Sequence, residues 1–214
     1  MGDGHDHAAT FDGLNDEYKR RLIIVTAINI GMFLVEMTAG QLSGSQALKA
    51  DALDFFADGV TYALSFWAIG KPLAVRASAA FAKGLSLLAM GLWVAGSTIW
   101  QLIVVGMPEP EVMGVVGVAA LVANLVSVWL LMAYKDGDSN VRSVWLCSRN
   151  DAIGNVAVVV AAGFVWWLNS GIPDLIVAGV MSLLFLNSAQ QILRQSYAEW
   201  RHARGDGHGH GHDH

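Results

Sequence analysis

Long apolar stretches alternate along the chain with short connectors that are polar or contain Gly and Pro. A membrane-spanning helix needs about 20 mostly apolar residues, and six stretches meet that length. The predicted spans are residues 22–41, 45–70, 79–105, 112–134, 141–168 and 173–193. Strands of a membrane β-barrel would be about 10 residues long with alternating polarity, which these stretches do not show. The pattern therefore predicts an all-α, polytopic membrane protein built as a six-transmembrane-helix bundle.

This pattern divides the chain into three regions. Residues 1–20 form a polar N-terminal tail, residues 21–195 the six-helix transmembrane domain, and residues 196–214 a His-rich C-terminal tail. The first twenty residues have no apolar core, so they are not a secretory signal peptide. We expect the first span itself to direct insertion into the membrane.

The composition supports a membrane protein and excludes several other classes. Of the 214 residues 54% are hydrophobic and only 14% are charged, too few to hydrate the surface of a soluble domain. The net charge is -5, and the charged residues form no basic face, so we expect no nucleic acid as a partner. We expect the lipid bilayer to surround the apolar stretches. The single cysteine excludes an internal disulfide. No nucleophile elbow, phosphate loop or paired-His zinc motif is present, so we expect neither an enzyme nor a bound cofactor.

Basic residues define an expected orientation. They gather at the two ends and in alternate connectors: Lys19, Arg20, Arg21, Lys71, Arg76, Lys135, Arg142, Arg194, Arg201 and Arg204. The opposite connectors carry Glu109, Glu111 and Asp174 and no Lys or Arg. Because basic connectors stay in the cytoplasm, both termini are predicted to be cytoplasmic. We expect a multi-pass protein of the bacterial inner (cytoplasmic) membrane.

Two predicted spans carry ionisable groups at helical spacing. The second contains Asp51, Asp54 and Asp58, whose spacings of three and four place them on one stripe. Ionisable side chains within a span usually face the bundle interior or a water-filled path. Three carboxylates on one buried stripe repel one another, so they need protons, a cation, or both. The fifth span repeats the spacing with Cys147, Asp151 and Asn155.

The two spans bring these groups to the same depth. With a rise of about 1.5 Å per residue, Asp54 lies roughly 14 Å from one surface and Asp151 roughly 15 Å from the other. In a hydrocarbon core of about 30 Å, both reach the middle. Two residues from each helix suffice for a tetrahedral ion. The predicted metal ligands are therefore Asp54, Asp58, Cys147 and Asp151.

Other readings of these polar residues remain open at this point. The acids could pair with Lys49, Lys83 or Arg149 and simply hold helices together, and Cys147 could be a small packing residue. Asp51 belongs to an outer vestibule, to a proton path, or to a hydrogen bond between packed helices. Asn29, Glu36 and Asn124 either make interhelical hydrogen bonds or line a pathway. The candidates for accessory groups or a proton path are Asp51, Glu36 and Asn155.

The chain ends in alternating Gly and His residues that can bind metal. The candidate ligands for metal capture are His208, His210, His212 and His214. Imidazole suits Zn, Ni and Cu, so the tail could raise the local concentration of cytoplasmic metal. The alternative is a solvated tail with adventitious affinity.

Two stretches together resemble the cation diffusion facilitator family. One runs from Glu36 through Gly40, Ser45, Ala47, Leu48 and the Ala50-Asp51-Ala52 triplet to Asp54 and Asp58; the other runs from Cys147 to Asp151 into an apolar helix rich in small residues. The resemblance covers roughly residues 20 to 195. It implies exchange of Zn²⁺ or related cations for protons, a homodimer, and a transport site of two residues from each of helices 2 and 5. Carried over, these residues are Asp54, Asp58, Cys147 and Asp151.

Two departures from the family pattern affect the expected function. Zinc-transporting members commonly have His where this chain has Cys147, and thiolate also suits softer ions such as Cd²⁺. Most members carry a cytoplasmic domain after helix 6, and we expect this chain to be a short member without it. Lys83 resembles a lysine that some members use near the dimer contact.

The sequence thus predicts efflux of a divalent cation, most simply Zn²⁺ and also Cd²⁺, by proton antiport. One alternative is a Co²⁺ or Ni²⁺ exporter. Another is a membrane metal-binding or sensing protein without turnover. A channel or a carrier of organic cations would need an aromatic-lined cavity, whereas Trp145, Trp166 and Trp167 lie near helix ends, as interfacial anchors do.

Overall fold

The computed structural model describes residues 15–67, 73–104, 106–136 and 139–205, which contain helices and no strand. The long helices in these residues are α1 (Asp16–Ser43), α2 (Gln46–Trp67), α3 (Leu73–Val104), α4 (Pro110–Leu131), α5 (Ser139–Leu168) and α6 (Ile172–Gly205). A short 3-10 helix, η1 (Met132–Tyr134), continues α4. The predicted all-α class is confirmed.

Five of the described helices contain a segment long and apolar enough to cross a membrane. These segments are Asp16–Ser43, Ser78–Val104, Pro110–Tyr134, Cys147–Leu168 and Ile172–Tyr197. The helix left out is α2, because its 22 residues contain Lys49, Asp51, Asp54 and Asp58. The chain is therefore a multi-pass membrane protein, and a sixth span through α2 stays a prediction.

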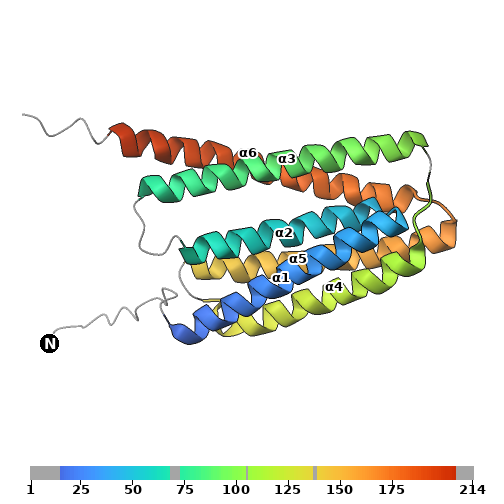
Figure 1. Ribbon diagram of the computed structural model, residues 1–214, viewed down its shortest axis with the longest axis horizontal. Helices are drawn as coiled ribbons and strands as arrows, with labels where there is room; N and C mark the ends of the chain where they lie inside the picture. The colour runs from blue at the N-terminus through green and yellow to red at the C-terminus, as the bar shows by residue number, and fades with distance from the viewer. Residues whose placement is uncertain (1–14, 68–72, 105, 137–138, 206–214) are drawn as a thin grey trace, which may run out of the picture.

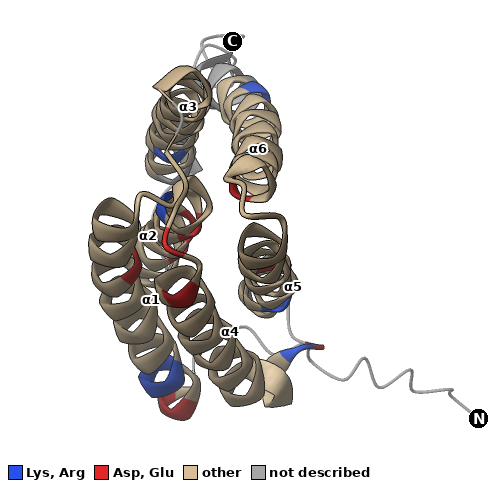
Figure 2. Cartoon of the chain, turned by 90° about the vertical axis from the view of Figure 1, so that its right-hand side faces the viewer, with Lys and Arg blue, Asp and Glu red and all other residues tan. Residues whose placement is uncertain are grey.

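The helices form one antiparallel bundle in two parts. α3 packs along α6, while α1 packs against α2 and α4, and α4 against α5 (Figure 1). Seen nearly end-on, α3 and α6 stand together on one side of the other helices (Figure 2). α2 contacts α1, α3, α5 and α6, so the helix that carries Asp51, Asp54 and Asp58 is surrounded by other helices. We call the end of the bundle that holds the start of α1 and the end of α6 the near end, and the opposite end the far end (Figure 1).

Apolar side chains cover the outside of the bundle and form three clusters inside it. The α3–α6 cluster fills the space between these helices and α2: Ala50, Ala57, Leu87, Val94, Ala178, Met181, Phe185 and Ala189. The near-end cluster consists of Tyr18, Leu22, Val25, Tyr62, Leu131 and Val144. The far-end cluster consists of Ala47, Leu48, Met113, Val158, Ala161, Ala162 and Val165. Exposed residues such as Leu34, Val115 and Leu183 suit contact with lipid tails.

A tight connection joins α1 to α2 at the far end. Gly44 follows α1 with φ +76°, a left-handed conformation that costs glycine little and ends the helix. Ser45 then caps the start of α2, because its Oγ accepts a hydrogen bond from the Leu48 N–H at 3.1 Å. Nearby, the Ser43 carbonyl accepts a hydrogen bond from the Glu109 N–H at 3.0 Å. The two helices are thus held as a hairpin with only two residues between them.

Asp174 of α6 binds the first turn of α2. Its carboxylate accepts hydrogen bonds from the Ser45 hydroxyl at 2.6 Å, the Gln46 N–H at 2.8 Å and the Ala47 N–H at 3.0 Å. Asp174 is fully buried. A carboxylate at a helix N-terminus satisfies free N–H groups and complements the helix dipole. Asp174 therefore caps α2 from a helix about 129 residues away in sequence.

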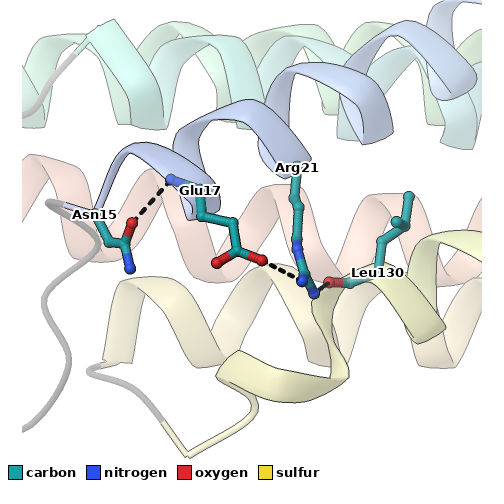
Figure 3. Close-up of polar contacts among 4 residues, drawn as sticks. All are labelled: Asn15, Glu17, Arg21 and Leu130. Carbon is teal, nitrogen blue, oxygen red and sulfur yellow. Dashed lines mark hydrogen bonds and ion pairs between the residues drawn. The ribbon is translucent and has the colours of Figure 1, made fainter.

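Polar groups also fix the near end of α1. The Asn15 side chain caps α1 by accepting a hydrogen bond from the Glu17 N–H at 2.8 Å (Figure 3). Arg21 pairs with Glu17 and donates to the Leu130 carbonyl at 2.9 Å, which ties α1 to the end of α4. These groups explain why α1 begins before the apolar stretch that starts at Leu22.

Replacing Asp174 with Ala should lower the free energy of unfolding by about 2–4 kcal/mol, because buried N–H groups of α2 lose their acceptor. Thermal unfolding of the purified protein in detergent measures the effect. Glu111→Ala is the control, since Glu111 is an exposed acid in the first turn of α4. An Asp174→Ala melting temperature equal to that of the control would contradict the capping role.

Candidate metal site

The predicted carboxylates of α2 and α5 meet between the near-end and far-end clusters. The Asp151 carboxyl group lies close enough to interact with both Asp54 and Asp58. Asp54 and Asp58 lie one turn apart on α2, so a single carboxyl group from α5 spans both. Two carboxyl groups can share a hydrogen bond only when one keeps its proton. Carboxyl groups this close repel one another when all are charged, so the arrangement suits a bound cation or a retained proton.

Cys147 lies one turn before Asp151 on the same face of α5. It is half-buried, packs against the near-end cluster, and lies within electrostatic range of Asp58 and Asp54. The structure therefore brings all four predicted ligands to one region. Among the described residues, however, no three His, Cys, Asp or Glu side chains are placed as a ready-made metal shell. Metal binding would thus require the side chains to rearrange.

Lys83 of α3 lies within electrostatic range of this region. It acts electrostatically on Asp54, Asp58 and Cys147, although no ion pair joins it to any of them among the described residues. The sequence connects Lys83 either with an ion pair to these acids or with a dimer contact. A positive charge beside empty acidic ligands offsets part of their mutual repulsion.

The reading in which lysines or arginines hold the α2 acids as ion pairs finds no support in the described residues. Their ion pairs join Asp16 to Lys19 and Glu17 to Arg21, both at the start of α1. Lys49 is buried, and its electrostatic partner is Asp174 rather than an acid of the candidate site. Arg149 is exposed, donates to Asn150 and stacks over the ring of Trp145.

Glu36 and Asp51 form a second buried acidic pair, one turn farther toward the far end. Glu36 of α1 is fully buried, and it interacts electrostatically with the buried Asp51 carboxyl group. No N–H or O–H group in the described part of the chain donates to either Glu36 oxygen or to Oδ2 of Asp51. Asp51 therefore contacts another helix, but through a carboxyl group that itself needs neutralising.

The predicted asparagines lie in the same interior. Asn155 follows Asp151 by one turn on α5, and both atoms of its buried amide lack a hydrogen-bond partner within the described residues. The same holds for Asn124 of α4. Asn29 donates to the Val25 carbonyl of its own helix at 3.0 Å. Among the described residues, none of the three makes an interhelical hydrogen bond, and pathway lining by Asn124 and Asn155 stays a prediction.

Sequence reasoning missed the polar groups on the near-end side of the candidate site. The Tyr62 hydroxyl donates a hydrogen bond to Oδ2 of Asp58 and lies 3.2 Å from the Ser148 hydroxyl. Tyr62 follows Asp58 by four residues, a helical spacing that could have indicated this contact from the sequence. His208, His210, His212 and His214 lie outside the described residues.

The sequence matches the family of the cation efflux transmembrane domain over residues 22–199. The chain belongs to this family. It is 30% identical to the zinc transporter ZitB of Escherichia coli (strain K12) over 209 residues, which cover 91% of this chain and 67% of that protein. The metal cation efflux system protein CzcD of Cupriavidus metallidurans is 27% identical, covering 90% of this chain and 66% of its own length. The cadmium, cobalt and zinc/H(+)-K(+) antiporter of Bacillus subtilis is 23% identical, covering 90% and 65%.

These matches define the class of the protein. It is a transporter and not an enzyme, and it is a multi-pass bacterial membrane protein. The chain spans about two thirds of the length of these relatives. The expected family membership is therefore confirmed, whereas the four metal ligands stay a prediction.

The Glu36–Asp51 pair predicts that Glu36→Gln stabilises the metal-free protein. The Gln amide can donate to Asp51 and removes one of two facing acids, which should add about 1–2 kcal/mol to the free energy of unfolding at neutral pH. Thermal unfolding in detergent tests this, with Glu109→Gln as the exposed control. A lower melting temperature for Glu36→Gln than for the control would show that this pair does not repel.

Proposed function

We propose that this protein exports divalent metal cations, chiefly Zn²⁺ and Cd²⁺, in exchange for protons. The ion would bind between α2 and α5 through Asp54, Asp58, Cys147 and Asp151. The observation that carries this proposal is the contact of Asp151 with both α2 carboxyl groups inside an apolar bundle. Membership of the cation efflux family supports the proposal that a cation binds where α2 and α5 meet.

The donor set supports soft and borderline metals. Three carboxylates alone would suit hard ions such as Mg²⁺, but a thiolate from Cys147 favours Zn²⁺ and Cd²⁺. The names of the relatives agree with this range, since they include a zinc transporter and an antiporter for cadmium, cobalt and zinc. Co²⁺ and Ni²⁺ form the second candidate set.

Proton exchange follows from the chemistry of the ligands. A metal ion binds deprotonated carboxyl and thiol groups, so its arrival releases protons and its departure lets protons return. Return of the empty site through the bundle is tolerable because the protonated groups carry no charge. We infer that Asp51, Glu36 and Asn155 extend this polar region toward the far end as the proton path. Their buried polar atoms have no hydrogen-bond partner among the described residues, which supports that role.

We also propose an orientation and an assembly. All six long helices would span the membrane with both termini in the cytoplasm, as the basic connectors predict. A homodimer is proposed on the family resemblance. The tail residues His208, His210, His212 and His214 would collect cytoplasmic metal.

Asp54→Asn and Asp151→Asn should each abolish Zn²⁺-driven proton flux, because removing a ligand charge leaves the ion with too few donors. Proteoliposomes containing a pH-sensitive dye measure the flux. Glu111→Gln, an exposed acid outside the candidate site, should behave as wild type. Wild-type flux in both variants would contradict the site. Metal binding without flux in the unaltered protein would instead favour a metal-binding or sensing role.

Cys147→His should shift metal preference toward Zn²⁺. The substitution replaces the soft thiolate with imidazole, which is also a good zinc ligand. The ratio of Cd²⁺ to Zn²⁺ transport should therefore fall by about tenfold, which corresponds to ~1.4 kcal/mol. A panel of Zn²⁺, Cd²⁺, Co²⁺ and Ni²⁺ in the same proteoliposomes measures this ratio. An unchanged ratio would mean that Cys147 does not touch the ion.

A further inference from the structure

Tyr62 lies at the near-end border of the candidate metal site. It belongs to α2, is fully buried, and follows Asp58 by one helical turn. Its hydroxyl donates to Oδ2 of Asp58. Two groups of α5 also approach this hydroxyl: the Ser148 Oγ at 3.2 Å and the Val144 carbonyl oxygen at 3.4 Å. The Tyr62 hydroxyl thus connects a proposed metal ligand to the helix that supplies the other two ligands.

A phenol hydroxyl has one proton to donate. While that proton is given to Asp58, the oxygen can accept a hydrogen bond from Ser148. The carbonyl of Val144 lies close enough to take the proton after a small rotation of the hydroxyl. The Tyr62 hydroxyl can therefore donate either to Oδ2 of Asp58 in the candidate site or to the Val144 carbonyl oxygen of α5.

The surroundings of Tyr62 close the site on this side. Its ring packs in the near-end cluster with Leu22 and Val25 of α1, Leu131 of α4 and Val144 of α5. Cys147 packs against the same cluster. The ring of Tyr62 on α2 thus packs against α1, α4 and α5. A metal ion that approached Asp58 from the near end would have to pass this ring.

We propose that Tyr62 is a positioning residue and a near-end gate: its hydroxyl occupies Asp58 while the site is empty, and an entering metal displaces it toward the Val144 carbonyl. This inference rests on the proposed function, because it takes Asp58 as a metal ligand. A hydroxyl bound to a charged ligand competes directly with the metal for that oxygen. Tyr62 would thus lower metal affinity and keep the empty site closed at the near end.

The test compares Tyr62→Phe with wild type, using the full chain in detergent. The variant keeps the aromatic ring and removes only the hydroxyl. Cd²⁺ titration followed by Cd²⁺–thiolate absorption should give a roughly tenfold lower Kd, the size expected when a hydrogen bond to a charged acceptor no longer competes. If Tyr62 had a purely structural role, loosened packing would leave the Cd²⁺ affinity of the variant unchanged or weaker.

Thr61→Val is the matched control. Thr61 is the preceding residue of α2, and its hydroxyl donates to the Ala57 carbonyl of the same helix at 2.6 Å rather than to a proposed ligand. Its Kd should equal that of wild type. Ser148→Ala provides a second variant that leaves Tyr62 in place, and it should lower the Kd in the same direction by a smaller factor, because the Tyr62 hydroxyl loses its partner.

The outcomes separate the gate from the site. If Asp58→Asn abolishes Cd²⁺ binding while Tyr62→Phe and Ser148→Ala bind as wild type or more weakly, the gate is overturned and the site stands. If Asp58→Asn binds Cd²⁺ as tightly as wild type, the site itself is overturned. Tighter binding in Tyr62→Phe, with Thr61→Val unchanged, supports the gate.

Discussion

The structure depends on the burial of several carboxyl groups within an apolar bundle. Asp51, Asp54 and Asp58 lie along α2, and Glu36 and Asp151 face them from α1 and α5. An isolated charge in such a setting is costly, so each acid needs a proton, a cation or a hydrogen-bond donor. This need explains why α2 occupies the centre of the bundle, where its neighbours can supply those groups and lipid does not touch the acids.

Much of the fold could be predicted from the sequence, because hydropathy reports which residues lie in lipid. The predicted stretch 112–134 agrees closely with α4 and η1, and 141–168 with α5. The predictions were too short where a helix continues into water. α1 begins at Asp16 with an Asn15 cap, and α6 extends past residue 193 to Gly205. The apolar pattern of a sequence ends at the membrane surface, whereas the backbone hydrogen bonds of a helix can continue beyond it.

The candidate site shows a similar division. Spacing on one helix predicted that Asp54 and Asp58 share a face, and matched depth predicted that Asp151 meets them. The partners that come from elsewhere in the chain were not predictable in this way. The bonds of Asp174 to the start of α2 and the contact of Ser148 with Tyr62 depend on how helices rotate against each other. Spacing within one helix carries no information about that rotation.

The three hydrogen bonds from Asp174 to the start of α2 also have a mechanical consequence. A helix of 22 residues is roughly 33 Å long at about 1.5 Å per residue. Because its first turn is fixed to α6, α2 can act as a lever with its pivot at the far end. A tilt of about 10° would then move its last residues by about 6 Å on such a length, while the bonds at the pivot stay intact. Small rotations at the far end of α2 would thus become large displacements at its near end, with the acids of α2 carried between them.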